Sequence, residues 1–338
     1  MEPLTLKLQK VKLIFFAMFL FVAIAINNQV HARPIVTIDG SSTVYPITEA
    51  VAEDFQIAKK GGIRVTVGIS GTGGGFKKFC RAEIDIVNAS RPIQHSEMEA
   101  CRAMGVQYIE MPIAYDALTV AVNPNNTWSR TMTVAELKKI WEPAAQGKIT
   151  KWNQINPSWP DERIKLFGAG ADSGTFDYFT EAIVGKAKSS RGDFTASEDD
   201  NVLVQGIATD RFSLGFFGFA YYIENQKKVN VVAIDNGNGG IIPSAETVEN
   251  GNYQPLSRPI FIYVNAKSVD KPEVNNFLYF YMENAPALVK EVKYFPLPAE
   301  AYQLNLKHLN ERKVGTVFEG ETKIDLSIEE LLKLERRL

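Results

Sequence analysis

Three short stretches of this sequence place Ser and Thr hydroxyls beside glycine: DGSSTVYP at 39–46, SGTGGGF at 70–76 and DSGTF at 172–176. Each follows a β-rich segment and opens a segment of helical character. Backbone N–H groups at a helix N-terminus bind anions with the help of the helix dipole, and glycine lets an anion approach the backbone. Because Ser and Thr are also ordinary N-caps, one such turn proves little. Three in one chain favour a shared anionic ligand.

The glycine-rich stretch GISGTGGGFKK also has to be compared with the nucleotide-binding loops. A Walker loop has Lys and a hydroxyl directly after its second glycine. Counted from Gly68, that second glycine is Gly73, and two further glycines stand where Lys and the hydroxyl belong. The fingerprint G-x-G-x-x-G, counted from Gly71, ends on Phe76. The spacing excludes both loops and leaves an anion site or a merely flexible turn.

Arg91 is the candidate for a charged ligand. It stands in ASRPI, directly after a predicted strand, and the following proline favours an extended backbone at Arg91. A guanidinium can give two parallel hydrogen bonds to a tetrahedral oxyanion. The alternative is a surface arginine, or one paired with a nearby carboxylate. Together with the three turns, we interpret Arg91 as a ligand.

The elements that must position these residues indicate an α/β fold. β-Branched segments at 35–38, 63–70 and 84–90 alternate with helical segments, which is typical of a parallel sheet. Ligands of such sheets bind outside the carboxyl ends of the strands, where the turns gather.

Two strongly β segments far apart in the sequence, near Ala114–Val122 and Pro259–Val264, are similar in character. We interpret them as strands that cross between two lobes. The prediction is a first lobe of residues 33–118 and 259–338 and a second lobe of residues 119–258.

The first 32 residues have the pattern of a cleaved secretory signal. Three lysines precede the apolar run 13–26, and Val30 and Ala32 fit the −3 and −1 positions of a cleavage site after Ala32. The alternative is a retained anchor, but the run has 14 residues, fewer than the roughly 18 of a spanning helix. No cysteine lies near the cut. We therefore expect a periplasmic or cell-envelope protein without a lipid anchor.

Charge and cysteine content fit this expectation. The chain carries a formal net charge of −2, and loss of three Lys and one Glu with the signal leaves −4. No nucleic-acid partner is predicted, and an anion must be held by a local site. In an oxidising compartment Cys80 and Cys101 are expected to pair, closing a loop worth about 3 kcal/mol, with two buried thiols as the alternative.

Catalysis has little support in the residue inventory. A secreted phosphatase or hydrolase needs a nucleophile with a base, or clustered His and Asp ligands for a metal. The three histidines are His31, within the signal, His95, which we interpret as solvated on a charged helix start, and His308. We predict a binding protein with no cofactor and no metal, and not an enzyme.

Six blocks carry a family resemblance: DGSSTVYP, GISGTGGGFKKF, IDIVNASRPI, AYDALTVAVN, ADSGTFDYFTEAI and PLSRPIFIYV. In this order they resemble the phosphate-binding receptors of the phosphate-specific ABC transporter, which are type II periplasmic binding proteins. The resemblance implies two α/β lobes, each a mixed sheet flanked by helices, and two hinge strands that close around phosphate. The chain's expected partners are inorganic phosphate and the membrane permease subunits of an ABC importer, and we expect a monomer. The expected phosphate ligands are Ser42, Thr43, Ser70, Gly71, Thr72, Arg91, Ser173, Gly174 and Thr175.

The chain departs from the best-known branch of this family at two charged positions. That branch has Asp where Arg91 stands, and Arg shortly before the Ser-Gly-Thr turn, where this chain reads GAGA at 168–171. The carboxylate that accepts the phosphate proton must therefore be another one: Asp39, Asp116, Asp172 or an acid of SEDDN at 197–201. Asp172 is the candidate because it lies next to the turn, with an N-cap role as the alternative. Receptors for sulfate or arsenate, and a sensor or adhesion protein that reuses the fold, remain alternatives.

Overall fold

The computed structural model describes residues 33–171, 173–321 and 326–338. The predicted signal at 1–32 and the candidate acceptor Asp172 lie outside the described residues. Ile35–Leu338 form one compact unit, and this unit contains all the elements of the α/β fold.

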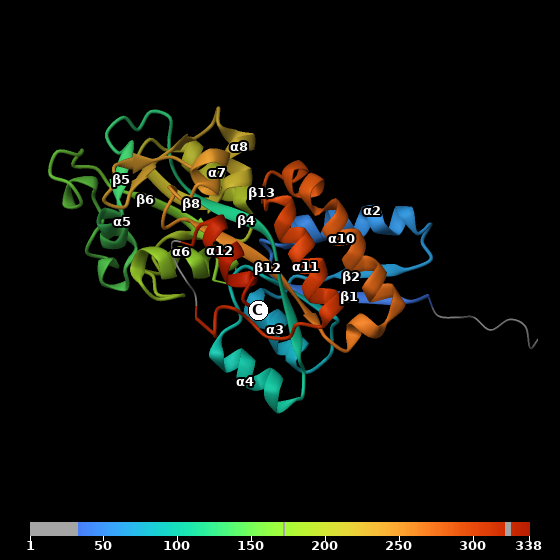
Figure 1. Ribbon diagram of the computed structural model, residues 1–338. Helices are drawn as coiled ribbons and strands as arrows, with labels where there is room; N and C mark the ends of the chain where they lie inside the picture. Colours follow the sequence, from blue (N-terminus) through green and yellow to red (C-terminus); the bar gives the residue numbers. More distant parts are fainter. Residues whose placement is uncertain (1–32, 172, 322–325) are drawn as a thin grey trace, which may run out of the picture. The chain divides into compact units, whose positions relative to one another are not determined.

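The β-branched segments of the N-terminal part form a parallel sheet, as predicted. β1 (Ile35–Gly40) pairs in parallel with both β2 (Arg64–Val67) and β3 (Ile86–Ala89). Because β1 lies between the other two strands, the crossovers through α2 (Tyr45–Ala58) and α3 (Thr72–Cys80) run in opposite directions. Right-handed crossovers then put the two helices on opposite faces of the sheet (Figure 1).

The two long β segments lie side by side. β4 (Tyr108–Val122) and β12 (Ser257–Asn265) are antiparallel neighbours, and every residue of both is buried. β12 also pairs with β3, whereas β4 from Leu118 onward pairs with β8 (Ser213–Gly218). β4 therefore belongs to the sheets of both lobes. The predicted class, a mixed α/β fold of two lobes with two connecting strands, is confirmed.

The second lobe is built on β8, β6 (Lys165–Ala169) and β7 (Thr195–Ser197), which run parallel. Its core is aromatic: the rings of Phe179 and Phe216 stack at 3.7 Å between centroids, and Trp141 meets both edge-on. Phe216 belongs to the aromatic run LGFFGFAYY, which is therefore largely core.

The remaining helices and strands complete both lobes. In the first lobe they are α4 (His95–Ala103), α10 (Pro272–Glu291), β13 (Phe295–Pro296), α11 (Ala299–Glu311) and α12 (Ile328–Glu335). In the second they are β5 (Thr131–Thr133), α5 (Val134–Trp141), α6 (Gly174–Val184), α7 (Asp200–Thr209), α8 (Phe219–Asn225), β9 (Asn230–Val231), β10 (Ala233–Asp235), β11 (Gly240–Ile241) and α9 (Ala245–Glu249).

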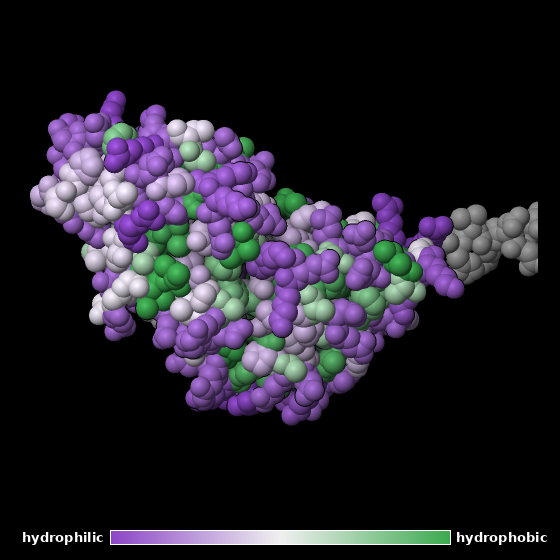
Figure 2. Space-filling view, turned by 90° about the horizontal axis from the view of Figure 1, so that it is seen from above, coloured by the Kyte–Doolittle hydropathy of each residue, from purple (hydrophilic) through white to green (hydrophobic). Residues whose placement is uncertain are grey.

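The described surface is largely hydrophilic on the face that Figure 2 shows, with hydrophobic residues in small, scattered patches. Among the described residues, no helix has both the length and the apolar character needed to cross a bilayer.

Candidate anion-binding site

The turn at 41–44, between β1 and α2, is fixed from within and leaves donors unused. Ser41 donates its N–H to the carbonyl oxygen of Asn88 at 2.9 Å, and its Oγ accepts the N–H of Thr43 at 3.1 Å. Ser42 is half-buried, and neither its N–H nor its hydroxyl donates to another described residue. Ser42 therefore retains two donors at the N-terminus of α2.

Ser70, in the turn before α3, is directed at a carboxylate. Asp39 accepts both the N–H of Ser70 at 2.9 Å and its hydroxyl at 2.7 Å, and it also accepts the ammonium of Lys78. Burial raises the pKa of Asp39. The hydrogen bonds from Lys78, Ser70 and the Gly40 N–H together lower it by a larger amount, so the net shift is downward. The donors of Ser70 are thus engaged by an ionised Asp39, and among the predicted ligands Ser70 has the weakest geometric support.

The N-terminus of α3 presents the donors that its glycines leave accessible. Gly71 precedes the helix with φ 74°, a left-handed conformation that glycine adopts without strain. The N–H groups of Thr72, Gly73 and Gly74 donate to no other described residue. The Thr72 hydroxyl lies 3.1 Å from Ser90 Oγ and accepts the Ser90 N–H at 3.2 Å. This helix start therefore meets the end of β3.

Arg91 is buried and held in an ion pair. Its Nη1 and Nη2 donate to the two carboxylate oxygens of Glu97 at 2.9 and 2.8 Å, and Nη1 also donates to the Pro92 carbonyl at 3.0 Å. Burial lowers the pKa of Arg91, whereas Glu97, together with Asp177 and Tyr263, raises it, and the net shift is upward. The structure therefore contains the alternative that the sequence left open, in which Arg91 is paired with a nearby carboxylate. The Nε–H of Arg91 donates to no described residue, so one edge of the guanidinium stays available.

The turn at 173–175 of the second lobe reaches the first lobe. Ser173 is the N-cap residue of α6, because its hydroxyl oxygen accepts the N–H of Thr175 at 3.1 Å. This turn therefore does cap a helix, which is the ordinary role of Ser and Thr at such positions. A Cβ on Gly174 would lie 2.1 Å from Ser90 Oγ and 3.5 Å from Ser41 Oγ. The N–H of Gly174 donates to no other described residue. Only a glycine permits this contact between the lobes.

Arg258, on β12, is a central residue that sequence analysis missed. It donates to Asp116 on β4 at 3.0 and 3.2 Å, to the carbonyl of Gly174 at 2.8 Å and to the Thr43 hydroxyl at 3.4 Å. Its guanidinium also lies 4.7 Å from the centre of the Tyr178 ring. Burial raises the pKa of Asp116, and the charge and hydrogen bonds of Arg258 offset part of this effect, so that the net shift is upward. A charged residue inside the apolar strand PLSRPIFIYV was the signal that could have revealed it.

Asp177, in the first turn of α6, is a second residue that sequence analysis missed. Its Oδ1 is buried, receives no hydrogen bond from the part of the chain that the structure describes, and lies 3.8 Å from the Lys188 ammonium. Burial raises its pKa, while the charges of Lys188, Arg91 and Arg258 lower it, with a net upward shift. A carboxylate of the second lobe thus lies within electrostatic reach of both buried arginines.

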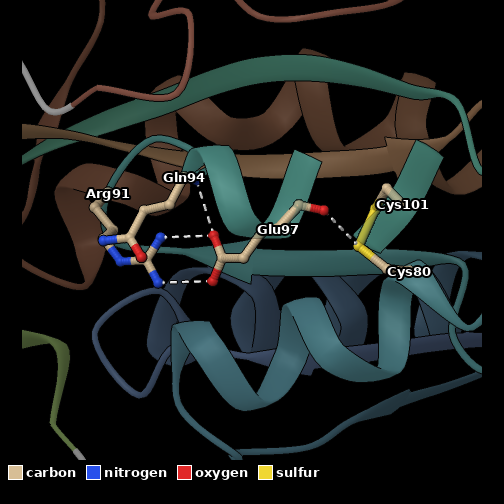
Figure 3. The surroundings of a disulfide bond; sticks show 5 residues. All are labelled: Cys80, Arg91, Gln94, Glu97 and Cys101. Atoms are coloured by element: carbon tan, nitrogen blue, oxygen red, sulfur yellow. Dashed lines mark hydrogen bonds and ion pairs between the residues drawn. A yellow bond between two sulfur atoms is a disulfide. The ribbon is translucent and has the colours of Figure 1, made fainter. Parts of the chain in front are cut away.

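The predicted cysteine pair is confirmed as a disulfide: Cys80 at the end of α3 is bonded to Cys101 in α4 (Figure 3). Of the predicted ligands, Thr72 of the first lobe and Gly174 of the second both meet Ser90, whereas Ser70 is turned toward Asp39. Within the described ranges, no three His, Cys, Asp or Glu side chains are grouped so that they could hold a metal ion.

Comparison with known proteins agrees with this architecture. Residues 27–285 match the PBP superfamily domain, and the chain belongs to the PBP superfamily. It is 55% identical over 299 residues to Protein SphX of Synechocystis sp., covering 88% of this chain and 89% of that protein. It is 36% identical over 268 residues to the Phosphate-binding protein PstS of Staphylococcus saprophyticus, covering 78% and 81%. The crystal structure of a possible phosphate binding protein from Planctomyces limnophilus is similar with a TM-score of 0.68 at 48% identity, covering 82% of this chain and 98% of that one.

Proposed function

We propose that this chain is an exported receptor for inorganic phosphate that delivers the anion to the permease subunits of an ABC importer. The observation that carries the proposal is the close approach of Gly174 to Ser90 and Ser41. Gly174 and the start of α3, which meets Ser90 through Thr72, both have N–H groups that donate to no described residue. The resemblance to a PstS protein named for phosphate binding supports the choice of anion.

The donors define how the anion is held. Neutral N–H and O–H groups fixed at helix starts stabilise an oxyanion without a net positive field, which suits a chain of negative net charge. The proposed ligands are Ser42, Thr43, Ser70, Gly71, Thr72, Arg91, Ser173, Gly174 and Thr175.

Closure of two lobes over the anion is the proposed motion. The proposed first lobe is residues 33–118 and 259–338, and the second is residues 119–258. Arg258 supports this motion because it lies on a connecting strand and donates to Thr43 in one lobe and to Gly174 in the other.

Asp172 stays a prediction as the acceptor of the phosphate proton. Phosphate near neutral pH can donate a proton to a buried carboxylate, whereas sulfate leaves that carboxylate unpaired at a cost of several kcal/mol. We further propose that the receptor acts as a monomer outside the cytoplasmic membrane.

The test is calorimetric titration of the protein recovered after export and stripped of bound anion. We expect one phosphate per chain, no binding of sulfate, and Arg33 as the first residue by N-terminal sequencing. Equal binding of sulfate refutes the phosphate assignment and keeps an oxyanion receptor. Binding of neither anion refutes the proposed function.

A further inference from the structure

We propose that Glu97 is a positioning residue for phosphate binding, which holds Arg91 with one guanidinium edge free, and that the Cys80–Cys101 disulfide keeps Glu97 in place. This inference rests on the proposed function, in which Arg91 is a ligand.

The carboxylate of Glu97 is fixed from two sides. It receives two hydrogen bonds from Arg91, and its Oε2 also accepts the N–H of Gln94 at 2.9 Å, which closes the capping box at the start of α4 (Figure 3). The side chains of Arg91 and Glu97 are only 10% and 14% exposed. With the Pro92 carbonyl on Nη1, these contacts use the end and one side of the guanidinium and leave the side that carries Nε.

The disulfide links this arrangement to the helix that supplies the N–H donors. Cys101 follows Glu97 by four residues, so both lie on one face of α4. Cys80 ends α3, and its Sγ lies 3.4 Å from the carbonyl oxygen of Glu97. One covalent bond therefore ties the helix whose first turn faces the candidate site to the helix that carries Glu97.

Two effects of Glu97 on phosphate binding have opposite signs. As a brace, it fixes a flexible cation before the ligand arrives, which strengthens binding. As a negative charge, it competes with phosphate for Arg91, which weakens binding. The capping bond and the disulfide immobilise the carboxylate independently of any ligand, so we infer that the bracing effect is the larger.

A double-mutant cycle tests the inference on the full exported protein, with phosphate as the titrated ligand. The variants are Glu97→Gln, Arg91→Gln and the pair, with Glu99→Gln on the exposed part of α4 as the matched control. We expect Glu97→Gln to weaken binding about 3- to 30-fold, and to have no further effect once Arg91 is replaced. Glu99→Gln should leave the affinity unchanged. Gln retains an acceptor for the Gln94 N–H, and circular dichroism checks that each variant is folded.

The disulfide is tested in the same cycle. Replacing both cysteines by Ser should weaken binding in the same direction with Arg91 present, and should change nothing in the Arg91→Gln background. Additive losses indicate a merely structural role of α4 and overturn the inference, as does tighter binding by Glu97→Gln. If the wild type binds phosphate and Glu97→Gln binds equally well, the proposed function stands and only the positioning role falls. Absence of phosphate binding by the wild type overturns both.

Discussion

Gly174→Ala is the substitution that most directly tests closure of the two lobes. The added Cβ would lie 2.1 Å from Ser90 Oγ, and Cβ contacts essentially never fall below 3.0 Å, so the turn has to move by about 0.9 Å. Rotation of the Ser90 hydroxyl offers only partial relief. It gives up the 3.1 Å contact with Thr72, and Ser90 Cβ still lies 3.2 Å from the new methyl group.

The magnitude follows from the cost of overpacking, which is about 1–3 kcal/mol for an inserted methyl group in a packed site. Because the clash is between residues of the two lobes, we expect it to destabilise the closed arrangement of the lobes and to leave the folding of each lobe unaffected. Phosphate affinity should therefore fall about 5- to 150-fold, while the thermal unfolding midpoint changes little.

The assay is calorimetric phosphate titration with two companion variants. Gly192→Ala, away from the candidate site, is the matched control, because within 4 Å its Cβ would meet only the Gln146 side chain, at an ordinary distance of 3.5 Å. In the Ser90→Ala background, Gly174→Ala should cost far less affinity than in the wild type, because the 2.1 Å contact is gone. An unchanged affinity of Gly174→Ala, or an equal loss in both backgrounds, refutes the closed contact as part of binding.

Three further outcomes are expected from buried charges. Arg258→Met leaves Asp116 unpaired and should lower the free energy of unfolding by about 3–5 kcal/mol, whereas Arg258→Met with Asp116→Leu should recover stability in urea melts without recovering phosphate affinity. Burial and the charge of Glu110 raise the pKa of Glu335 to about 9 from 4.5, so folding costs more as pH rises between these values. Glu335→Gln should therefore exceed the wild type in unfolding free energy by a margin that grows with pH, by up to about 1.4 kcal/mol per unit; a constant margin contradicts this. Burial raises the pKa of Asp85, but its hydrogen bonds lower it by a larger amount. Asp85 therefore contributes fully to folding stability above its pKa in the unfolded chain, near 3.8, and this contribution is lost as the pH falls below that value. The acid branch of the stability curve should flatten in Asp85→Asn.

The strands and turns were predictable because their signals are local. Alternation of β-branched residues located β1, β2 and β3, and Ser, Thr and Gly marked the helix starts that follow β1, β2 and β6. That β4 and β12 are long strands was also predictable, because both segments are rich in apolar and β-branched residues, although β4 contains Glu110 and Asp116 and β12 contains Arg258.

Glu97 and Arg258 could not be placed from the sequence because their roles depend on packing. The helix start at His95 was interpreted as a solvated face, which holds for the exposed His95, whereas Glu97 two residues later turns inward to Arg91. Arg258 and Asp116 are separated by 142 positions and meet only because β4 and β12 are in register. The hydrophobic pattern predicts which face of a strand is buried. It does not predict which two buried charged residues pair with each other.

The charges around the candidate site cancel in pairs, and this explains its glycines. Arg91 is paired with Glu97, Lys78 with Asp39, and Arg258 with Asp116. A site with no net positive charge cannot hold an anion by Coulomb attraction alone, so its affinity has to come from oriented dipoles at short range. Short range requires the anion to touch backbone N–H groups, and side chains at the start of α3 would prevent that contact. In the proposed site, Gly73 and Gly74 are thus the counterpart of the paired cations, because their N–H groups donate to no described residue. Gly68 and Gly75 have another reason: a Cβ there would clash with Asp39, or with Gly40 and Val87.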